Sequence, residues 1–301
     1  MQPDLNALAV FALVAEERSF RAAADRLGVT RSAVSQVIRR LEETMGIALV
    51  QRTTRSVSLT EAGAQLFAQV APAIADMHAA VEETGSLKGR LRGQLRLAVS
   101  SIAERFLAGP FLAGFAAAYP DIQVDVVVTD DEFDIVAEGY DAGVRLGEVI
   151  EQDMIAVPVS GQQRQLSVAA PSYLAASGRP AHPRELVAHR CIGWRPAPKV
   201  APYRWEFAEG GQEFSVAVAP EITTNDMALM IKLALSGAGI TFGMEETFLP
   251  WLKRGELEAV LEDYCPRFQG FYLYYPSRRN LAPKLRALID HLKQPGAGLT
   301  H

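Results

Sequence analysis

Cysteine is scarce in this chain, and long apolar runs are missing. Cys191 and Cys265 are the only cysteines in 301 residues, too few for the disulfide framework of a small secreted domain. No uninterrupted apolar stretch reaches the roughly 18 residues that a membrane-spanning helix needs. The segment MQPDLNALAVFALVAEERSF has no basic start and no small-residue cleavage site, so we expect no signal peptide. These absences predict a cytoplasmic protein without a membrane segment.

Signature motifs of common enzyme classes are also missing. The sequence contains no GxSxG, GxxxxGK[ST], HExxH or CxxC motif. Its five histidines show no metal-ligand spacing, and Pro183 lies between His182 and His189. We therefore expect no catalytic residues, no cofactor and no metal.

The composition and charge indicate a folded protein with one basic end. Apolar residues make up 49% and charged residues 22% of the chain, as in globular proteins, and the length suits about two or three domains. The net charge is −5, but the stretch from Arg18 to Arg55 carries +5 and the remainder −10. A basic end on an acidic protein is typical of a DNA-binding head, although a solvated charged face is the alternative.

Hydrophobic periodicity at the N-terminus predicts three helices, at residues 5–17, 20–27 and 31–44. Ser19 and Thr30 are suited to cap the second and third helices. The third helix has an apolar stripe and an opposite polar stripe, which is typical of the recognition helix of a helix-turn-helix. The polar stripe consists of Ser32, Ser35, Gln36 and Arg39, with Arg31 at its start.

After these helices the pattern predicts a β-ribbon and then a long helix. Two short strands are expected around Thr53–Ser56, with Arg52 and Arg55 at the tip. Thr60 then begins a helix that reaches about Leu87 and that we expect to bend at an internal proline. The helix carries an apolar seam with spacings of three and four, which predicts pairing with a second copy. The seam consists of Phe67, Val70, Ile74, Met77 and Val81.

The remainder of the chain, beyond a basic hinge at residues 88–93, alternates strand-like and helix-like runs. This alternation predicts βαβ units with parallel sheets, and therefore the α/β class. The strands are expected at residues 94–99, 122–129, 141–144 and 166–170, and the helices at 106–119, 131–138 and 228–236.

The N-terminal text FALVAEERSFRAAADRLGVTRSAVSQVIRRLEETMGIALVQRTTRSVSLTEAG resembles the LysR-type transcriptional regulators. Val50-Gln51 departs from that family, which has a phenylalanine before the arginine. Five later segments resemble the family more loosely: YPDIQVDVVV, EGYDAGVRLGE, HRCIGW, LSGAGITF and YPSRRNLAPKLRALIDHL. The positions that match in the head include Ser19, Phe20, Ala22, Ala23, Leu27, Ser32, Ala33, Val34, Ser35, Ile38, Leu41, Glu42, Gly46, Arg52, Arg55, Leu59, Thr60 and Gly63.

The resemblance implies a regulator that binds double-stranded DNA and a small-molecule effector, as a homodimer or tetramer. Effector domains of this family are similar to periplasmic binding proteins, with two α/β lobes, two crossover strands and a ligand cleft between the lobes. The implied division is a winged helix-turn-helix over residues 1–59, a dimerisation helix over 60–88 and an effector domain over 91–294. Lobe one is expected at residues 91–161 and 268–294, lobe two at 162–267, and the second crossover near Gln269–Tyr275.

Charge and side-chain chemistry suggest roles for the residues of the head. Phosphate contacts dominate affinity for DNA, whereas contacts to base edges set specificity. Arg31, Arg52 and Arg55 are the phosphate candidates, and we expect Arg26 to be solvated surface. Glutamine bonds adenine and arginine bonds guanine in the major groove, so Ser32, Ser35, Gln36 and Arg39 are the base-edge candidates. An exposed polar face without a partner is the alternative.

Residues near strand ends and helix starts suggest an effector site. The candidates are Ser100, Ser101, Thr129, Arg145 and Asn225. Hydroxyls and free backbone N–H groups at helix starts share an anion's charge, and an arginine adds direction. The pattern predicts a small carboxylate effector, with an amino acid as the next possibility because Asp226 is near. As alternatives, Ser100 and Asn225 are plain caps and Arg145 is a structural ion-pair partner.

Cys191 and Cys265 are expected to be buried and inert, although Arg190 and Arg267 leave a redox role open.

Two other functions are alternatives to a regulator. An enzyme is the first, which the missing motifs disfavour. A solute-binding protein for transport is the second; it explains only the body and lacks a signal peptide.

Overall fold

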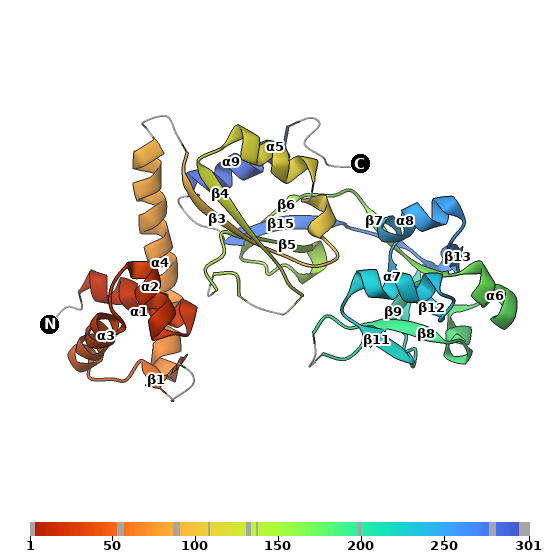
Figure 1. Ribbon diagram of the computed structural model, residues 1–301, viewed down its shortest axis with the longest axis horizontal. Helices are drawn as coiled ribbons and strands as arrows, with labels where there is room; N and C mark the ends of the chain where they lie inside the picture. The colour runs from red at the N-terminus through yellow and green to blue at the C-terminus, as the bar shows by residue number, and fades with distance from the viewer. Residues whose placement is uncertain are drawn as a thin grey trace.

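The computed structural model describes residues 4–52, 57–86, 91–107, 109–130, 134–136, 138–197, 200–276 and 281–294. A helical head with one long helix lies at one end of the molecule, a first α/β lobe in the middle and a second lobe at the other end (Figure 1). Within the described residues, no helix is both long and apolar enough to cross a membrane.

The head contains the three predicted helices. They are α1 (Leu5–Glu17), α2 (Phe20–Leu27) and α3 (Arg31–Met45), followed by β1 (Val50–Arg52) and β2 (Val57–Leu59). The hydroxyl of Ser19 accepts the amide of Ala22 at 3.2 Å, and that of Thr30 accepts the amide of Ala33 at 3.2 Å. Gly28 ends α2 at φ +66°, a conformation that glycine adopts without strain. The sequence-predicted caps are therefore confirmed.

Contacts to its backbone fix the wing to the helices on both sides. Strands β1 and β2 pair antiparallel. The carboxylate of Glu42 in α3 accepts the amides of Leu49 and Val50 at 2.9 and 3.1 Å. On the other side, a Cβ at Gly63 would lie 2.0 Å from the carbonyl oxygen of Leu49. Only glycine therefore allows the start of the next helix to approach the wing so closely.

The long helix α4 spans Glu61–Ser86 and contains Pro72. The prediction of a seam exposed along the whole helix is wrong for its first half. Phe67 is 7% exposed and Ile74 is partly buried, because both pack into the core of the chain's own head. Farther along, Met77 and Val81 are 56% and 72% exposed. The first turns of α4 thus belong to the head, and only the last turns present apolar side chains outward.

Lobe one is a five-stranded mixed sheet in the order β4-β3-β5-β15-β6. Its strands are β3 (Gly93–Val99), β4 (Ile122–Val128), β5 (Ala142–Leu146), β6 (Met154–Pro158) and β15 (Phe271–Pro276), with helices α5 (Pro110–Ala118) and α9 (Pro283–Leu292) and 3-10 turns η1 (Glu104–Phe106) and η2 (Gly147–Val149). The βαβ prediction holds for β3, α5 and β4, and β5 also runs parallel to β3. Strand β15 returns from lobe two and runs antiparallel to β5 and β6, which the prediction of purely parallel sheets missed.

Two predicted helices of lobe one are wrong in extent. The helix expected at 106–119 is the turn η1 followed by α5, which starts at Pro110 after Gly109 at φ +66°. The helix expected at 131–138 is absent from the described part of that segment, 134–136 and 138–140, which forms turns. Glycine and proline interrupt the first, and Gly139 at φ +71° directly follows the second.

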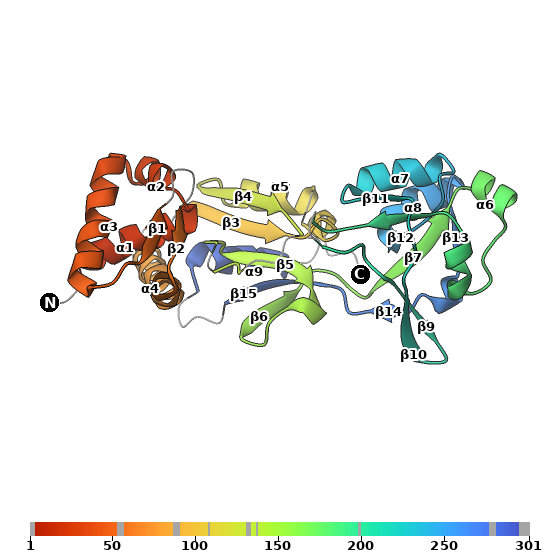
Figure 2. The same ribbon diagram turned by 90° about the horizontal axis from the view of Figure 1, so that it is seen from below.

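Lobe two has a second mixed sheet in the order β11-β8-β12-β7-β13, with β14 also pairing with β7, and a separate β9-β10 ribbon. Its elements are β7 (Gln163–Ala169), α6 (Pro171–Ser177), η3 (Pro183–Ala188), β8 (Cys191–Trp194), β9 (Trp205–Glu209), β10 (Gln212–Val216), β11 (Ile222–Thr224), α7 (Met227–Leu235), β12 (Ile240–Met244), α8 (Glu245–Arg254), β13 (Glu258–Val260), η4 (Glu262–Tyr264) and β14 (Arg267–Phe268). The β9-β10 ribbon projects away from the sheet of lobe two (Figure 2).

The chain passes between the lobes twice, and the two crossovers touch. The backbone amide of Phe271 donates to the hydroxyl of Ser160 at 2.8 Å, and the amide of Val159 donates to the carbonyl of Phe271 at 2.9 Å. A Cβ at Gly270 would lie 2.1 Å from the carbonyl oxygen of Gly161. The second crossover, expected near Gln269–Tyr275, is thus the link from β14 into β15.

Candidate functional site

The polar stripe of α3 lies on the outer face of the head. Its apolar stripe is buried against the other helices, with Val34, Ile38 and Leu41 at most 2% exposed. The opposite face exposes Arg31, Ser32, Gln36 and Arg39, while Ser35 is half-buried. Helix α3 therefore presents a row of hydrogen-bond donors and acceptors and two guanidinium groups outward.

Three further arginines of the head, Arg26, Arg52 and Arg55, are assigned roles from the sequence. Arg52 ends β1, but its side chain and the whole of Arg55 lie outside the described residues. Arg26 forms ion pairs with Glu16 at 3.2 Å and Glu17 at 2.9 Å, so its charge is balanced within the head. The Arg26 side chain is half-exposed, as expected of a surface residue, but it is also ion-paired, which the sequence did not predict.

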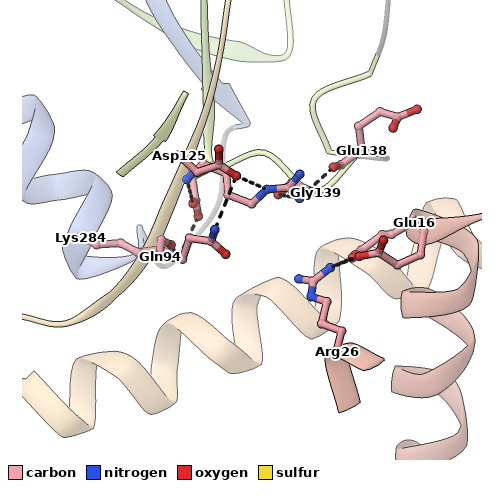
Figure 3. A network of polar contacts seen from close by, with 10 residues as sticks. Glu16, Arg26, Gln94, Asp125, Glu138, Gly139 and Lys284 are labelled. Atoms are coloured by element: carbon pink, nitrogen blue, oxygen red, sulfur yellow. Dashed lines mark hydrogen bonds and ion pairs between the residues drawn. The ribbon is translucent and has the colours of Figure 1, made fainter. Parts of the chain in front are cut away.

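Glu16 and Arg26 of the head lie beside Gly139 of lobe one (Figure 3). The guanidinium of Arg96 in β3 donates to the carbonyls of Glu138 and Gly139 at 3.3 and 3.2 Å. A Cβ at Gly139 would lie 3.5 Å from the Glu16 carboxylate of α1. Burial raises the pKa of Glu16, although Arg26 acts in the opposite direction. The carboxylate of Glu16 is thus partly desolvated where the head meets lobe one.

An ion pair crosses the same boundary. The guanidinium of Arg18, which ends α1, bonds the Glu138 carboxylate of lobe one at 3.0 Å. The Arg18 side chain is 73% exposed, and exposed ion pairs contribute only about 0–1 kcal/mol. This ion pair between the head and lobe one is therefore weak.

A cavity of about 400 Å³ lies between the two lobes. Lobe one contributes the ends of β3 and β5, and lobe two contributes β7, β8, β9, α7 and β12. The lining residues are Ser100, Ile102, Asp130, Arg145, Leu146, Glu148, Val149, Gln165, Trp194, Pro196, Tyr203, Glu206, Met227, Phe242, Gly243 and Met244. A cavity of this size and mixed lining suits a small organic molecule.

Three polar side chains define the chemistry of this cavity. Ser100 is 9% exposed, and neither its hydroxyl nor the indole Nε1 of Trp194 finds a hydrogen-bond partner among the described residues. The hydroxyl of Tyr203 donates to the Glu206 carboxylate at 2.7 Å. Burial and this hydrogen bond raise the pKa of Tyr203, so its hydroxyl remains a proton donor at neutral pH.

A second cavity of about 270 Å³ adjoins the first. The two share the wall formed by Leu146, Glu148, Gln165, Tyr203 and Glu206. The second cavity extends beneath the β9-β10 ribbon, where Glu213, Phe214 and Ser215 line it. Glu148 and Glu206 therefore line both cavities.

The cavity brings together two of the five residues predicted for the effector, Ser100 and Arg145. Neither cavity is lined by the other three. The amide of Ser101 donates to Asp130 at 2.8 Å, and its hydroxyl is buried away from the cavity. The amide of Thr129 extends the β-ladder to Val99.

The third residue, Asn225, is exposed and lies just before α7. It does not cap that helix, because Asp226 accepts the amide of Leu229 at 3.0 Å. The segment after Ser101 leads into the 3-10 turn η1. It therefore lacks the free helix N-terminus that the prediction assumed. The sequence also missed Glu148, Trp194, Tyr203 and Glu206, because no local pattern indicates which side chains two lobes bring together.

Both cysteines are buried thiols. Burial raises the pKa of Cys191 to about 12 and that of Cys265 to about 11. Reactive thiols need a lowered pKa and access to solvent, so these features favour the inert interpretation. Among the residues that the structure describes, no cluster of His, Cys, Asp or Glu could hold a metal ion.

Comparison with known protein families matches nearly the whole chain. Residues 5–64 match the model described as bacterial regulatory helix-turn-helix protein, lysR family. Residues 88–296 match the model described as LysR substrate binding domain.

Individual relatives align over the full length. The chain is 39% identical to the Escherichia coli protein called uncharacterized HTH-type transcriptional regulator YcaN, over 97% of this chain and 96% of the relative. It is 33% identical to the Escherichia coli regulator PgrR, over 96% and 97%. Among solved structures, CrgA from Neisseria meningitidis, a LysR-type transcriptional regulator, matches with a TM-score of 0.58 at 28% identity, covering 97% of this chain and 100% of CrgA.

Proposed function

Because this chain belongs to the LysR family of transcriptional regulators, we propose that it reads its operator through the outer face of α3 and responds to a small molecule held between its two lobes. The chain is a DNA-binding transcriptional regulator with an effector-binding domain. The observation that carries the proposal for DNA is the outward polar face of α3, opposite a fully buried apolar face.

The residues of the head take two roles in this proposal. Gln36 and Arg39, with Ser32 and Ser35, contact base edges in the major groove. Arg31, Arg52 and Arg55 contact phosphates, and the two wing arginines do so from the tip of the β1-β2 ribbon. Base contacts set sequence preference, whereas phosphate contacts release counterions and set the salt dependence of binding.

The test is fluorescence anisotropy with the DNA upstream of the protein's own gene. Gln36→Ala should change which bases are preferred, because each bidentate contact contributes about 1–3 kcal/mol of discrimination. The double variant Arg52→Ala/Arg55→Ala should weaken binding to all sequences alike and reduce the slope against salt by about 2. A wing variant that altered specificity and kept the salt slope would reverse these roles.

The proposal includes a homodimer formed through the end of α4 and located in the cytoplasm, where bacterial DNA lies. Met77 and Val81 are exposed on that part of the helix, and exposed apolar side chains on one helix face favour association. Met77→Glu/Val81→Glu should therefore yield smaller species in light scattering. The matched control is Glu61→Gln at the other end of α4, which should leave the mass unchanged. An unchanged mass in both would exclude this interface.

The effector site of the proposal is the interlobe cavity. The prediction of a carboxylate effector depends on Arg145 together with hydroxyls and free amides. Ser100 and Arg145 support it, but Thr129 and Asn225 lie away from the cavity lining. The lining also adds the carboxylates of Asp130, Glu148 and Glu206. This composition does not favour an anion.

A further inference from the structure

The interlobe cavity carries more negative than positive charge. In its described lining, the carboxylates of Asp130, Glu148 and Glu206 outnumber the guanidinium of Arg145. Arg145 also interacts within the chain. Opposite charges attract and like charges repel more strongly in a cleft with low-dielectric walls than in open water. The lining therefore attracts cations and disfavours a simple carboxylate.

Aromatic rings line the same space. The rings of Trp194 and Tyr203 meet edge to face with centroids 6.3 Å apart, and those of Tyr203 and Phe242 stack at 6.5 Å. The face of an aromatic ring carries negative potential and attracts an ammonium group placed within about 6 Å of its centroid. Aromatic faces next to carboxylates are an arrangement that binds an organic ammonium group.

Two buried polar groups point to a ligand independently of the charges. Ser100, a residue more than nine-tenths buried, lines the cavity, and its buried hydroxyl has no partner among the described residues. The indole Nε1 of Trp194 is in the same situation. A buried donor that stays unpaired costs about 1–3 kcal/mol. A molecule that accepts a hydrogen bond from Trp194 and bonds Ser100 removes this cost.

The two exposed carboxylates of the cavity come from opposite lobes. Glu148 lies in η2 of lobe one, and Glu206 lies in β9 of lobe two. The hydroxyl of Tyr203 fixes the position of Glu206 at 2.7 Å. The two negative charges line one cavity from opposite lobes, so they repel each other across the lobe boundary when the cavity is empty. A cation between them removes that repulsion and adds attraction to both lobes.

We propose that the effector is a small organic cation, with an ammonium group between Glu148 and Glu206, an apolar body against the aromatic rings, and a hydrogen-bond acceptor facing Trp194. The inference rests on the proposed function, since it takes the interlobe cavity as the effector site. Such a ligand binds the closed arrangement of the lobes better than the open one. Differential affinity of this kind is what allows a ligand to shift a conformational equilibrium.

Calorimetry on the full-length protein tests the charge class with three probes of one shape. Phenylalaninol is the cation, 3-phenyllactate the anion, and 3-phenylpropane-1,2-diol the neutral compound. Phenylalaninol should bind at least about tenfold more tightly than either of the others, a difference of about 1.4 kcal/mol. Its affinity should fall as salt rises, because salt screens exposed charges. Tighter binding of 3-phenyllactate, or no binding of phenylalaninol up to about 10 mM, would overturn the proposal.

Charge-neutral variants locate the cation. Glu148→Gln and Glu206→Gln should each weaken phenylalaninol binding about fivefold or more, because each removes one attractive charge. Glu213→Gln is the matched control, since it removes the same charge from the neighbouring cavity only. It should change the affinity less than about twofold. Equal losses in all three variants would place the ligand in the neighbouring cavity and overturn the assignment.

DNA anisotropy on the same samples tests the proposed function separately from the cationic effector. Specific DNA binding together with exclusive binding of the anion leaves the proposed function intact and refutes the cationic effector. Binding of phenylalaninol without any specific DNA binding refutes the proposed function and supports the chemistry assigned to the cavity. A change of the DNA affinity on addition of phenylalaninol supports both.

Discussion

Arg105 of lobe one and Glu246 of lobe two form an ion pair across the lobe boundary, with a nitrogen–oxygen distance of 3.0 Å. Arg105 lies in η1 directly after the segment that carries Ser100, and Glu246 lies in the first turn of α8 after the cavity residue Met244. The pair thus joins the two lobes beside the proposed effector site.

The Arg105–Glu246 pair should contribute little to stability. Both side chains are about one-third exposed, and solvent and salt screen such pairs to about 0–1 kcal/mol. A double-mutant cycle with Arg105→Ala and Glu246→Ala in urea unfolding should give a coupling energy within that range. A coupling above about 2 kcal/mol would show that the pair is a major lobe clamp.

Gly270 should tolerate no side chain. In Gly270→Ala the new Cβ would meet the carbonyl oxygen of Gly161 at 2.1 Å, so the two crossovers must move apart. Overpacking of this kind typically costs about 1–3 kcal/mol, measurable by urea unfolding. The matched control is Gly114→Ala in α5, whose Cβ would meet the ring of His291 at 3.4 Å. It should change the stability by less than about 1 kcal/mol.

Both thiols should be inert in the folded protein. Burial raises the pKa of Cys191 to about 12 and that of Cys265 to about 11, and the thiolate is the reactive form. Reaction with Ellman's reagent at pH 8 should be at least about 100-fold slower than in urea. Mild peroxide should leave DNA binding unchanged. Fast modification of one thiol in the folded state would reopen the redox interpretation.

The contact between head and lobe one should depend on pH through Glu16. Burial raises the pKa of this carboxyl in the folded state, so folding favours its protonated form. Its contribution to stability is therefore largest at acidic pH and is lost as the pH rises through the raised pKa. Glu16→Gln should remove this part of the pH dependence.

Thermal unfolding between about pH 4.5 and 7 measures the Glu16 effect. The stability of Glu16→Gln relative to the unmodified protein should increase as the pH rises. Glu17→Gln removes the same charge and the other ion pair of Arg26, and its relative stability should change less over this range. Parallel curves for the two variants would assign the pH dependence to other groups.

Local sequence signals predicted the head well and the cavity poorly. Ser19, Thr30 and Gly28 act through hydrogen bonds and backbone angles within a few residues, so their roles can be inferred from the sequence alone. The seam of α4 was misjudged because Phe67 and Ile74 have the spacing of a partner interface yet pack into the chain's own head. Hydrophobic periodicity shows that a helix face is covered, but it does not show whether a second copy or the chain's own head covers it.

The cavity depends on contacts between residues far apart in sequence. Glu148 and Trp194 come from different lobes, and no periodicity relates them. Asn225 is predicted to contact the effector, with a plain helix cap as the alternative, but it lies outside the cavity lining and its neighbour Asp226 makes the capping hydrogen bond.

The paired crossovers have a mechanical consequence. With the amide of Phe271 bonded to the hydroxyl of Ser160 and Gly270 against Gly161, the two links are held together at one place, where they can act as a hinge. Lobe two can then turn as a rigid lever, with the cavity close to the pivot and its outer helices far from it. A displacement of one ammonium group's width near the pivot is magnified at the far end of the arm. A rotation of this kind would convert the binding of a small molecule into a large rearrangement of the outer surface without distortion inside either lobe.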